Sequence, residues 1–252
     1  MSVEYEVRNG VAWLTINRPE ARNSLNKAVR EGLFDGVRRF NSDDGARVLV
    51  LTGAGDKAFC AGGDLKEMSE ERLTIPPVDY VPQFGRNIEV EKPTIAAING
   101  VAYAGGFLLA QTCDLCVAST TASFAITEAR VGRGSPWAAP LSAMIPRRIA
   151  MELVLTAAPL GAQRAYEIGF VNRLAEPGDL VAVTQSLAEQ ISANAPLSVA
   201  AGKRTVGLIA QHPLDEAFVH AEKIWAPVYL SGDAQEGMHA FKDRRQPVWK
   251  GQ

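Results

Sequence analysis

The hydrophobic positions of this chain change their period along its length. Near the start, short runs of alternating apolar and polar residues predict two strands, at 3–7 and 11–16. Apolar residues then recur at helical spacing over 25–40, and Ser24 or Asn26 is a suitable N-cap for that helix. The opening of the chain is therefore expected to form a hairpin followed by an amphipathic helix.

Fully apolar runs at 47–52, 94–98 and 115–118 predict buried strands, and an apolar helix is expected at 106–112 between the last two. Beyond Pro136 the pattern is mostly helical, with one short strand expected at 171–174. The expected helices are 137–145, 147–157, 161–168, 178–194, 197–210, 214–226 and 233–243. Strands in the first half and helices in the second predict an α/β core with a helical C-terminal portion.

The stretch 69–91 has three prolines and no clear period. A long segment without secondary structure is often functional in a compact domain, so this one is expected to form a mobile flap or a pocket wall.

Composition narrows the class of protein. The chain has 252 residues, of which 47% are hydrophobic, so it can bury a large core and is not a disordered chain. Its formal net charge of −2 argues against nucleic acid as the main partner. No apolar run has the length of a membrane span, and the first residues lack a signal-peptide pattern, so a cytoplasmic protein is expected.

The three cysteines include a C-x-x-C pair, Cys113 and Cys116. A redox or metal site is one interpretation, but no further ligands stand at paired zinc spacing. The favoured interpretation is two small buried residues, at a helix end and in the next strand. No metal is expected.

Two glycine-rich loops carry the clearest chemical signal. One is 58–64, which reads Ala-Phe-Cys-Ala-Gly-Gly-Asp, and the other lies within 92–114, where Gly105-Gly106 opens the apolar helix. The start of a helix presents free backbone N–H groups, and glycine allows a ligand to approach them closely. Two such donors directed at one oxygen would form an oxyanion hole.

These loops, taken with three other segments, resemble the crotonase family, also called the enoyl-CoA hydratase/isomerase family. The matching segments follow the family's order along nearly the whole chain; they are 17–25, 58–64, 92–114, 124–132 and, more weakly, 241–247. The resemblance implies an α/β spiral of strand-strand-helix turns over 1–194. It also implies a helical trimerisation region over 195–252, in a homotrimer or hexamer.

The resemblance implies that the backbone N–H groups of Gly63 and Gly105 bind a thioester oxygen and that Glu128 is the acid/base residue. Glu128 lies in a largely apolar stretch, where desolvation favours the protonated carboxyl. The alternative is a surface glutamate paired with Arg130. Histidines occur only in the C-terminal helices, so a Ser-His-Asp or Cys-His site has no support.

Leu108 departs from the conventional hydratases of the family, which carry a second glutamate at this position. Two carboxylates suit the addition of water, whereas one is enough to move a proton between C2 and C4 and so shift a double bond. Some isomerases of the family also have a single glutamate, as do hydratase-lyases and decarboxylases. A non-catalytic acyl-CoA-binding relative is a further alternative.

The run after Gly132 also departs from conventional hydratases. Arg133 is a candidate for binding a substrate carboxylate, and the alternative is a surface arginine. Trp137 is a candidate pocket wall, and the alternative is core packing.

The acyl-CoA ester is the only ligand that the resemblance implies, with coenzyme A as part of the substrate rather than a separate cofactor. The substrate-binding candidates combine loop positions, basic residues and pocket residues. They are Ala21, Arg22, Ala61, Asp64, Lys66, Leu108, Arg133, Trp137, Phe241 and Arg244.

Overall fold

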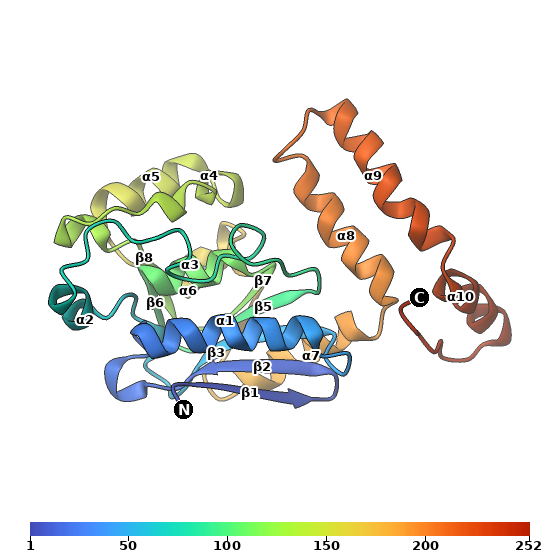
Figure 1. The fold of residues 1–252 in the computed structure, drawn as a ribbon, viewed down its shortest axis with the longest axis horizontal. Helices are drawn as coiled ribbons and strands as arrows, with labels where there is room; N and C mark the ends of the chain where they lie inside the picture. The colour runs from blue at the N-terminus through green and yellow to red at the C-terminus, as the bar shows by residue number, and fades with distance from the viewer.

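A computed structural model describes residues 1–252, and its centre is a six-stranded sheet (Figure 1). The strand order is β1-β2-β3-β5-β7-β10, and only the edge strand β1 is antiparallel to its neighbour. The strands are β1 Val3–Arg8, β2 Val11–Ile16, β3 Val48–Gly53, β5 Thr94–Ile98, β7 Leu115–Ser119 and β10 Arg173–Ala175. Every strand expected from the apolar runs is present, with β10 beginning two residues and ending one residue later than expected.

A second sheet of four short strands completes the fold. Its strands are β4 Ala58–Cys60, β6 Val101–Tyr103, β8 Ser123–Ala125 and β9 Leu160–Gly161, of which only β9 is antiparallel. Together with α2 (Leu65–Glu70) and α3 (Gly105–Thr112), these strands make the turns β3-β4-α2 and β5-β6-α3. The expected spiral of strand-strand-helix turns is therefore present.

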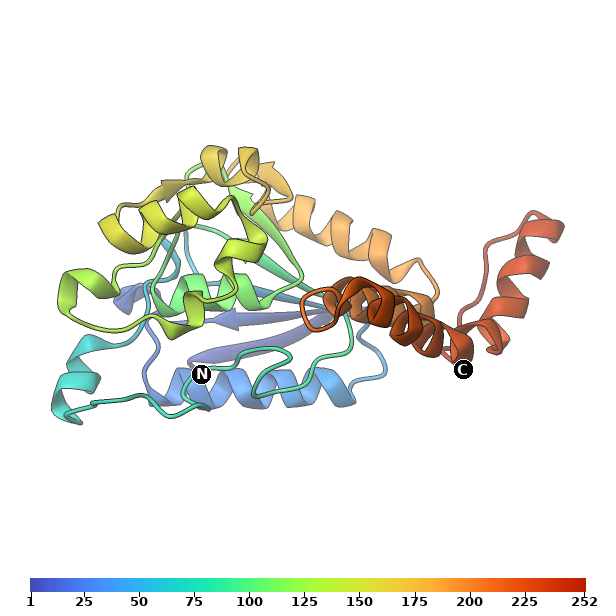
Figure 2. The same cartoon turned by 90° about the horizontal axis from the view of Figure 1, so that it is seen from above.

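The larger sheet separates two cores. In β2, Ala12 and Leu14 face the main core, between the two sheets and α1 (Lys27–Ser42), while Val11 and Trp13 face a second core under α7 (Leu180–Ser192). Figure 2 shows α1 and α7 on opposite faces of the sheet. The predicted N-cap of α1 is confirmed, because the Asn26 side chain accepts a hydrogen bond from the Val29 N–H.

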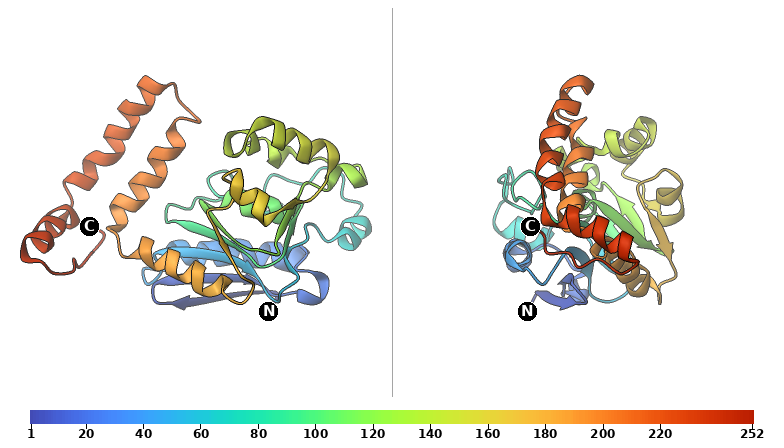
Figure 3. Two further views of the ribbon diagram at one scale, coloured as in Figure 1. Left: turned by 180° about the vertical axis from the view of Figure 1, so that it is seen from behind. Right: turned by 90° about the vertical axis from the view of Figure 1, so that its right-hand side faces the viewer.

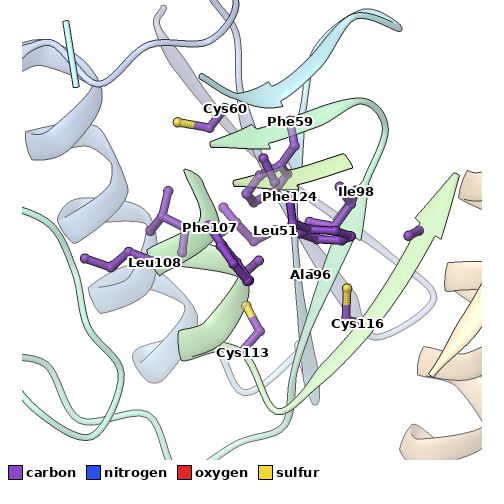
Figure 4. Packing of buried hydrophobic residues seen from close by; sticks show 14 of the residues in the cluster. Leu51, Phe59, Cys60, Ala96, Ile98, Phe107, Leu108, Cys113, Cys116 and Phe124 are labelled. Carbon is purple, nitrogen blue, oxygen red and sulfur yellow. The ribbon is translucent and has the colours of Figure 1, made fainter. Parts of the chain in front are cut away.

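Aromatic side chains fill the main core beside α3. Phe107 packs against Phe124 and Phe170, with ring centroids 5.5 and 5.1 Å away (Figure 4). Cys113 and Cys116 lie in the same core, and burial raises the pKa of both thiols. The C-x-x-C pair is thus buried in apolar surroundings, as the favoured interpretation holds.

The second half of the chain is helical as predicted, but one predicted helix is wrong. The helix expected at 137–145 is broken into a short 3₁₀ helix, η3 (Pro136–Ala138), and α4 (Leu141–Met144), because Pro140 has no N–H to continue a helix. The remaining helices are close to their expected places. They are α5 Arg147–Thr156, α6 Ala162–Glu167, α7, α8 Pro196–Leu208, α9 Leu214–Tyr229 and α10 Gly232–Asp243.

Helices α8, α9 and α10 form an arm that stands away from the sheets (Figures 1 and 3). Lys203 of α8 joins it to the core through an ion pair with Asp114 at 2.8 Å and a hydrogen bond to the Lys92 carbonyl. The arm exposes large apolar side chains, including Phe218, Leu230 and Phe241. None of its helices, nor any other in the structure, combines the length and apolar character that crossing a membrane requires.

Candidate active site

The first glycine loop leaves β4 and places a free N–H at Gly63. The neighbouring backbone groups are paired, since Leu25 N–H binds the Gly62 carbonyl and Asp64 N–H binds the Leu25 carbonyl. The Gly63 N–H has no partner within the chain. Gly62 has a φ of +101°, a conformation that strongly favours glycine, and it turns the loop toward α3.

The second donor belongs to Gly105, the first residue of α3. At this position the N–H has no acceptor within the helix and lies at its positive end. The two loops approach closely, because a Cβ placed on Gly62 would lie 3.4 Å from the Gly105 nitrogen. A Cβ on Gly106 would collide with the Cys60 carbonyl. The structure therefore brings the two predicted donors together.

Ala104 holds the second loop in a strained conformation. Its φ of 49° and ψ of −118° are unfavourable for a residue with a Cβ. Hydrogen bonds fix it on both sides: its N–H donates to the Ala125 carbonyl at 2.9 Å, and its carbonyl accepts from Leu108 at 3.0 Å. Strain of this kind is commonly found at functional sites, and here it orients the Gly105 peptide.

Glu128 begins the short 3₁₀ helix η2 (Glu128–Val131) and is half-buried. Its Oε1 accepts a hydrogen bond from Trp137 Nε1 at 3.0 Å, whereas its Oε2 is buried without a partner. Burial raises the pKa of this carboxyl, and hydrogen bonds from nearby backbone and from Trp137 oppose the rise only in part. Arg130 is exposed and forms no ion pair with Glu128, so the surface-pair alternative does not describe this residue.

Leu108 and Trp137 both pack with the main core, and Trp137 also contacts the Glu128 carboxyl. Leu108 is only 7% exposed and packs in the main core, pointing away from the Phe107–Phe124 pair (Figure 4). Trp137 packs edge-on against Phe107, with centroids 6.1 Å apart, so it is a core residue as well as the donor to Glu128. This donor role was not predicted from the sequence.

Arg133 links the Glu128 loop to the segment 69–91, which was expected to form a mobile flap or a pocket wall. It is half-buried rather than a free surface residue, and its Nη1 donates to the Leu73 carbonyl at 2.8 Å. The segment has no helix or strand between 71 and 93, and Val81 and Val90 are buried in the main core. It therefore forms a wall, to which Arg133 is attached.

A second group of candidates surrounds the loop after η1 (Pro19–Ala21). Arg22 is exposed there and borders a cavity of about 210 Å³ that Lys57 also lines. Asn23 shapes this loop from a fully buried position, because its Nδ2 donates to the Ala58 carbonyl at 2.7 Å. Ala61 N–H donates to the Arg22 carbonyl, which ties the loop to the first glycine loop.

Asp64 and Lys66 have different surroundings. The Asp64 side chain caps α2 and pairs with Arg18 at 3.1 Å. Burial acts to raise the pKa of Asp64, but the hydrogen bond from Arg18 and those from the α2 backbone outweigh it and keep the pKa below its usual value. This carboxylate therefore organises the loop, whereas Lys66 is exposed on α2 and free to meet a ligand.

Comparison with known proteins decides the family. The family model for enoyl-CoA hydratase/isomerase matches residues 6–252. The chain belongs to the enoyl-CoA hydratase/isomerase family. It is therefore an enzyme of a family of lyases and isomerases that act on acyl-CoA substrates.

Relatives within this family match over nearly the whole chain. (E)-benzylidenesuccinyl-CoA hydratase of Thauera aromatica is 38% identical over 100% of both chains, and carnitinyl-CoA dehydratase of Escherichia coli is 36% identical over 97% of both. An enoyl-CoA hydratase structure from Mycobacterium marinum is 41% identical and covers 100% of this chain and 99% of its own, with a TM-score of 0.92. One from Bacillus anthracis is 32% identical over 100% of both chains, with a TM-score of 0.94.

Two family-based candidates are not brought to this site within one chain. Phe241 and Arg244 are exposed at the end of α10, and Figures 1 and 2 show α10 at the opposite end of the molecule from α2. Sequence reasoning also missed Gln111, a buried polar residue on α3. The signal that could have found it is its amide within the otherwise apolar run Phe107–Ala110.

Proposed function

We propose that the enzyme isomerises enoyl-CoA esters by moving the double bond from the C3–C4 position to the C2–C3 position, with Glu128 as the only proton carrier. One observation carries the proposal: Glu128 has a free Oε2, and the position three residues after the glycine that opens α3 holds the apolar Leu108 instead of a second carboxyl. A proton shuttle needs one carboxyl group, whereas the activation of water benefits from two.

The proposed steps balance with this single group. The thioester oxygen accepts hydrogen bonds from the N–H groups of Gly63 and Gly105. Glu128, ionised, takes a proton from C2, and the electron pair spreads over the dienolate and its oxygen, where the two donors stabilise the charge. The same carboxyl then returns the proton to C4, leaving the double bond between C2 and C3. Burial raises the pKa of Glu128, which favours this return.

Hydration of a 2-enoyl-CoA is the second candidate, because relatives at 38% and 36% identity are named as a hydratase and a dehydratase. In that reaction Glu128 alone would orient the water that adds to C3 and would supply the proton for C2. Hydratase-lyase or decarboxylase chemistry on another acyl-CoA, and acyl-CoA binding without turnover, are the remaining alternatives.

Coenzyme A is assigned to the basic side of the site. Arg22 and Lys57 beside the 210 Å³ cavity, with Lys66 on α2, supply positive charge for its phosphates. The exposed apolar arm is assigned to contacts between copies in a homotrimer or hexamer. Phe241 and Arg244 would contact coenzyme A only if the arm of one copy reached the core of another. Sedimentation of the purified chain, with and without an acyl-CoA, tests this assembly.

The deciding experiment compares a 3-enoyl-CoA with crotonyl-CoA, a 2-enoyl-CoA, as substrates. We expect conversion of the first to its 2-enoyl isomer, with slow addition of water to the second, when products are separated by chromatography. Glu128→Gln should lower turnover by about 10²–10⁴-fold and keep acyl-CoA binding, since the amide retains the shape but cannot exchange a proton. Fast hydration would favour the second candidate, and binding without turnover of either ester would favour a non-catalytic role.

A further inference from the structure

Gln111 is the one buried side chain in the structure in which an amide nitrogen and an amide oxygen both lack partners. The residue is 8% exposed, and neither Oε1 nor Nε2 makes a hydrogen bond. Its neighbour Thr112 differs, since its hydroxyl accepts a hydrogen bond from the Phe84 N–H. The isolation of Gln111 is therefore a property of this residue and not of the whole helix end.

An amide buried in this way costs free energy, because water has been removed and nothing in the protein replaces it. Native proteins pair nearly all such groups, so an exception calls for an explanation. No backbone or side-chain group of this chain supplies either partner. The missing donor and acceptor must then come from outside the chain, from a ligand, a bound water or a second copy of the chain.

The position of Gln111 on α3 connects it with the reaction site. It follows Leu108 by three residues, and Leu108 follows Gly105 by three, so Gln111 neighbours Leu108 on the helix surface and Leu108 neighbours Gly105. A rise of 1.5 Å per residue places Gln111 about 9 Å beyond the oxyanion-hole glycine along the axis. Its side chain leans back toward the turn that contains Phe107 and Leu108.

The surroundings of that turn belong to the same site. Phe107, four residues before Gln111, packs on Trp137, which donates to Glu128. On the other side, the wall segment is joined to α3 through Thr112 and carries Tyr80, whose hydroxyl is also buried without a partner. Gln111 thus lies one helical turn beyond Leu108, on a helix that contacts Trp137 through Phe107 and the wall segment through Thr112.

We propose that Gln111 recognises a neutral polar group, a hydroxyl or a carboxamide, at the far end of the acyl chain. This inference rests on the proposed function, since it needs an acyl-CoA thioester in the oxyanion hole. An amide carries one acceptor and one donor group, and both are satisfied by a partner that also donates and accepts. A methyl-terminated acyl chain would leave both atoms unpaired, so the site selects against it.

The test uses two 3-enoyl-CoA esters of equal chain length, one ending in a hydroxyl and the other in a methyl group. The variant Gln111→Met keeps the length of the side chain and removes its hydrogen bonding. Leu109→Met, on the opposite side of α3, is the matched control for a methionine in this helix. Values of kcat/KM are measured for both esters with the wild type and both variants.

We expect the wild type and Leu109→Met to prefer the hydroxyl ester, and Gln111→Met to lose that preference by about 100-fold or more. Equal effects of Gln111→Met on kcat/KM for both esters would overturn the inference and assign the amide to a bound water. Turnover of both esters in that case would still support the proposed function. If neither ester is turned over, the proposed function fails in its catalytic part. The affinities of the wild type for the two esters, measured by calorimetry, then decide the inference. Tighter binding of the hydroxyl ester supports it, and equal affinities overturn it.

Discussion

Trp137 donates its indole N–H to Oε1 of Glu128 at 3.0 Å, and the other oxygen of the same carboxyl, Oε2, is buried without a partner. The indole is neutral, so it orients the carboxyl without adding a charge beside it. Because the hydrogen bond stabilises the ionised form, it also limits the rise in the pKa of Glu128 that burial causes.

Trp137→Phe should therefore raise the pKa of Glu128 further. A base must be ionised to accept a proton, so the acidic limb of kcat/KM should move to higher pH, with a loss of activity that is largest below neutrality. The measurement is a pH–rate profile of both enzymes. A profile that falls uniformly without moving would show that the indole acts through packing alone.

Glu128→Gln should stabilise the folded protein at neutral pH. The folded-state pKa of Glu128 is raised above 4.5, so between the two pKa values the unfolded chain loses this proton while the folded chain keeps it. The free energy of unfolding of the wild type therefore falls as pH rises from the unfolded-state pKa to the folded-state pKa of Glu128. Glutamine has no proton to lose, so the variant does not show this fall. The Tm difference between variant and wild type should be positive at pH 7 and shrink below about pH 4.5; a difference independent of pH would contradict the assignment.

Leu108→Glu tests whether the missing carboxyl limits hydration. The substitution should raise the rate of water addition to a 2-enoyl-CoA and lower the free energy of unfolding by about 1–3 kcal/mol, since it puts a polar group in an apolar site. Leu108→Gln is the control, because it adds polarity without an acid. Rapid hydration by the unaltered enzyme would show instead that Leu108 does not disfavour water addition.

Arg133→Met should weaken the use of acyl-CoA esters that carry a second carboxylate by about 10-fold or more, and of plain fatty esters less. The half-buried guanidinium of Arg133 offers a fork of donors to a carboxylate, and its charge offsets repulsion by Glu128. Since Arg133 also holds the Leu73 carbonyl, hydrogen exchange around Leu73 should be followed in the same variant. Equal losses of activity on both classes of ester, together with faster hydrogen exchange around Leu73, would show that Arg133 only stabilises the wall segment.

Ala104→Gly should raise the free energy of unfolding by about 1 kcal/mol, because glycine adopts the conformation of this residue without strain. It should at the same time lower kcat, since the Gly105 peptide becomes less firmly oriented. Ala102→Gly, in the regular strand β6, is the matched control and should destabilise by about 0.5–1 kcal/mol. Chemical denaturation and steady-state kinetics of the two variants separate strain from a general glycine effect.

The sequence located those helices and strands in which apolar residues recur at a regular spacing. The runs that form β2, β3 and β5, and the amphipathic α1 with its Asn26 cap, could be located because burial sets their pattern. The strands of the second sheet have two or three residues each, which is too few to show alternation. The glycine loops and Glu128 were located by resemblance to the family, since no period marks them.

Contacts between distant residues could not be predicted in the same way. Arg133 and Leu73 are 60 positions apart, and no local pattern joins them. Ala104 adopts its strained conformation because the flanking hydrogen bonds to Ala125 and Leu108 impose it, whereas an alanine on its own favours a negative φ. Tertiary structure decides both cases.

The second core has a consequence for the synthesis of the chain. Most of its sheet face is present once β7 has been made, and only Ala175 of β10 joins that face later. Helix α7, which covers the face, begins more than 60 residues after β7, and Trp13 meets Gln185 at a separation of 172 positions. At ordinary rates of translation the interval between β7 and α7 takes on the order of 3–12 s. During that interval Val48, Val50 and Ile95 form an uncovered apolar row on the sheet. The nascent chain on the ribosome, before α7 emerges, is therefore the form of this protein most exposed to aggregation and to capture by chaperones.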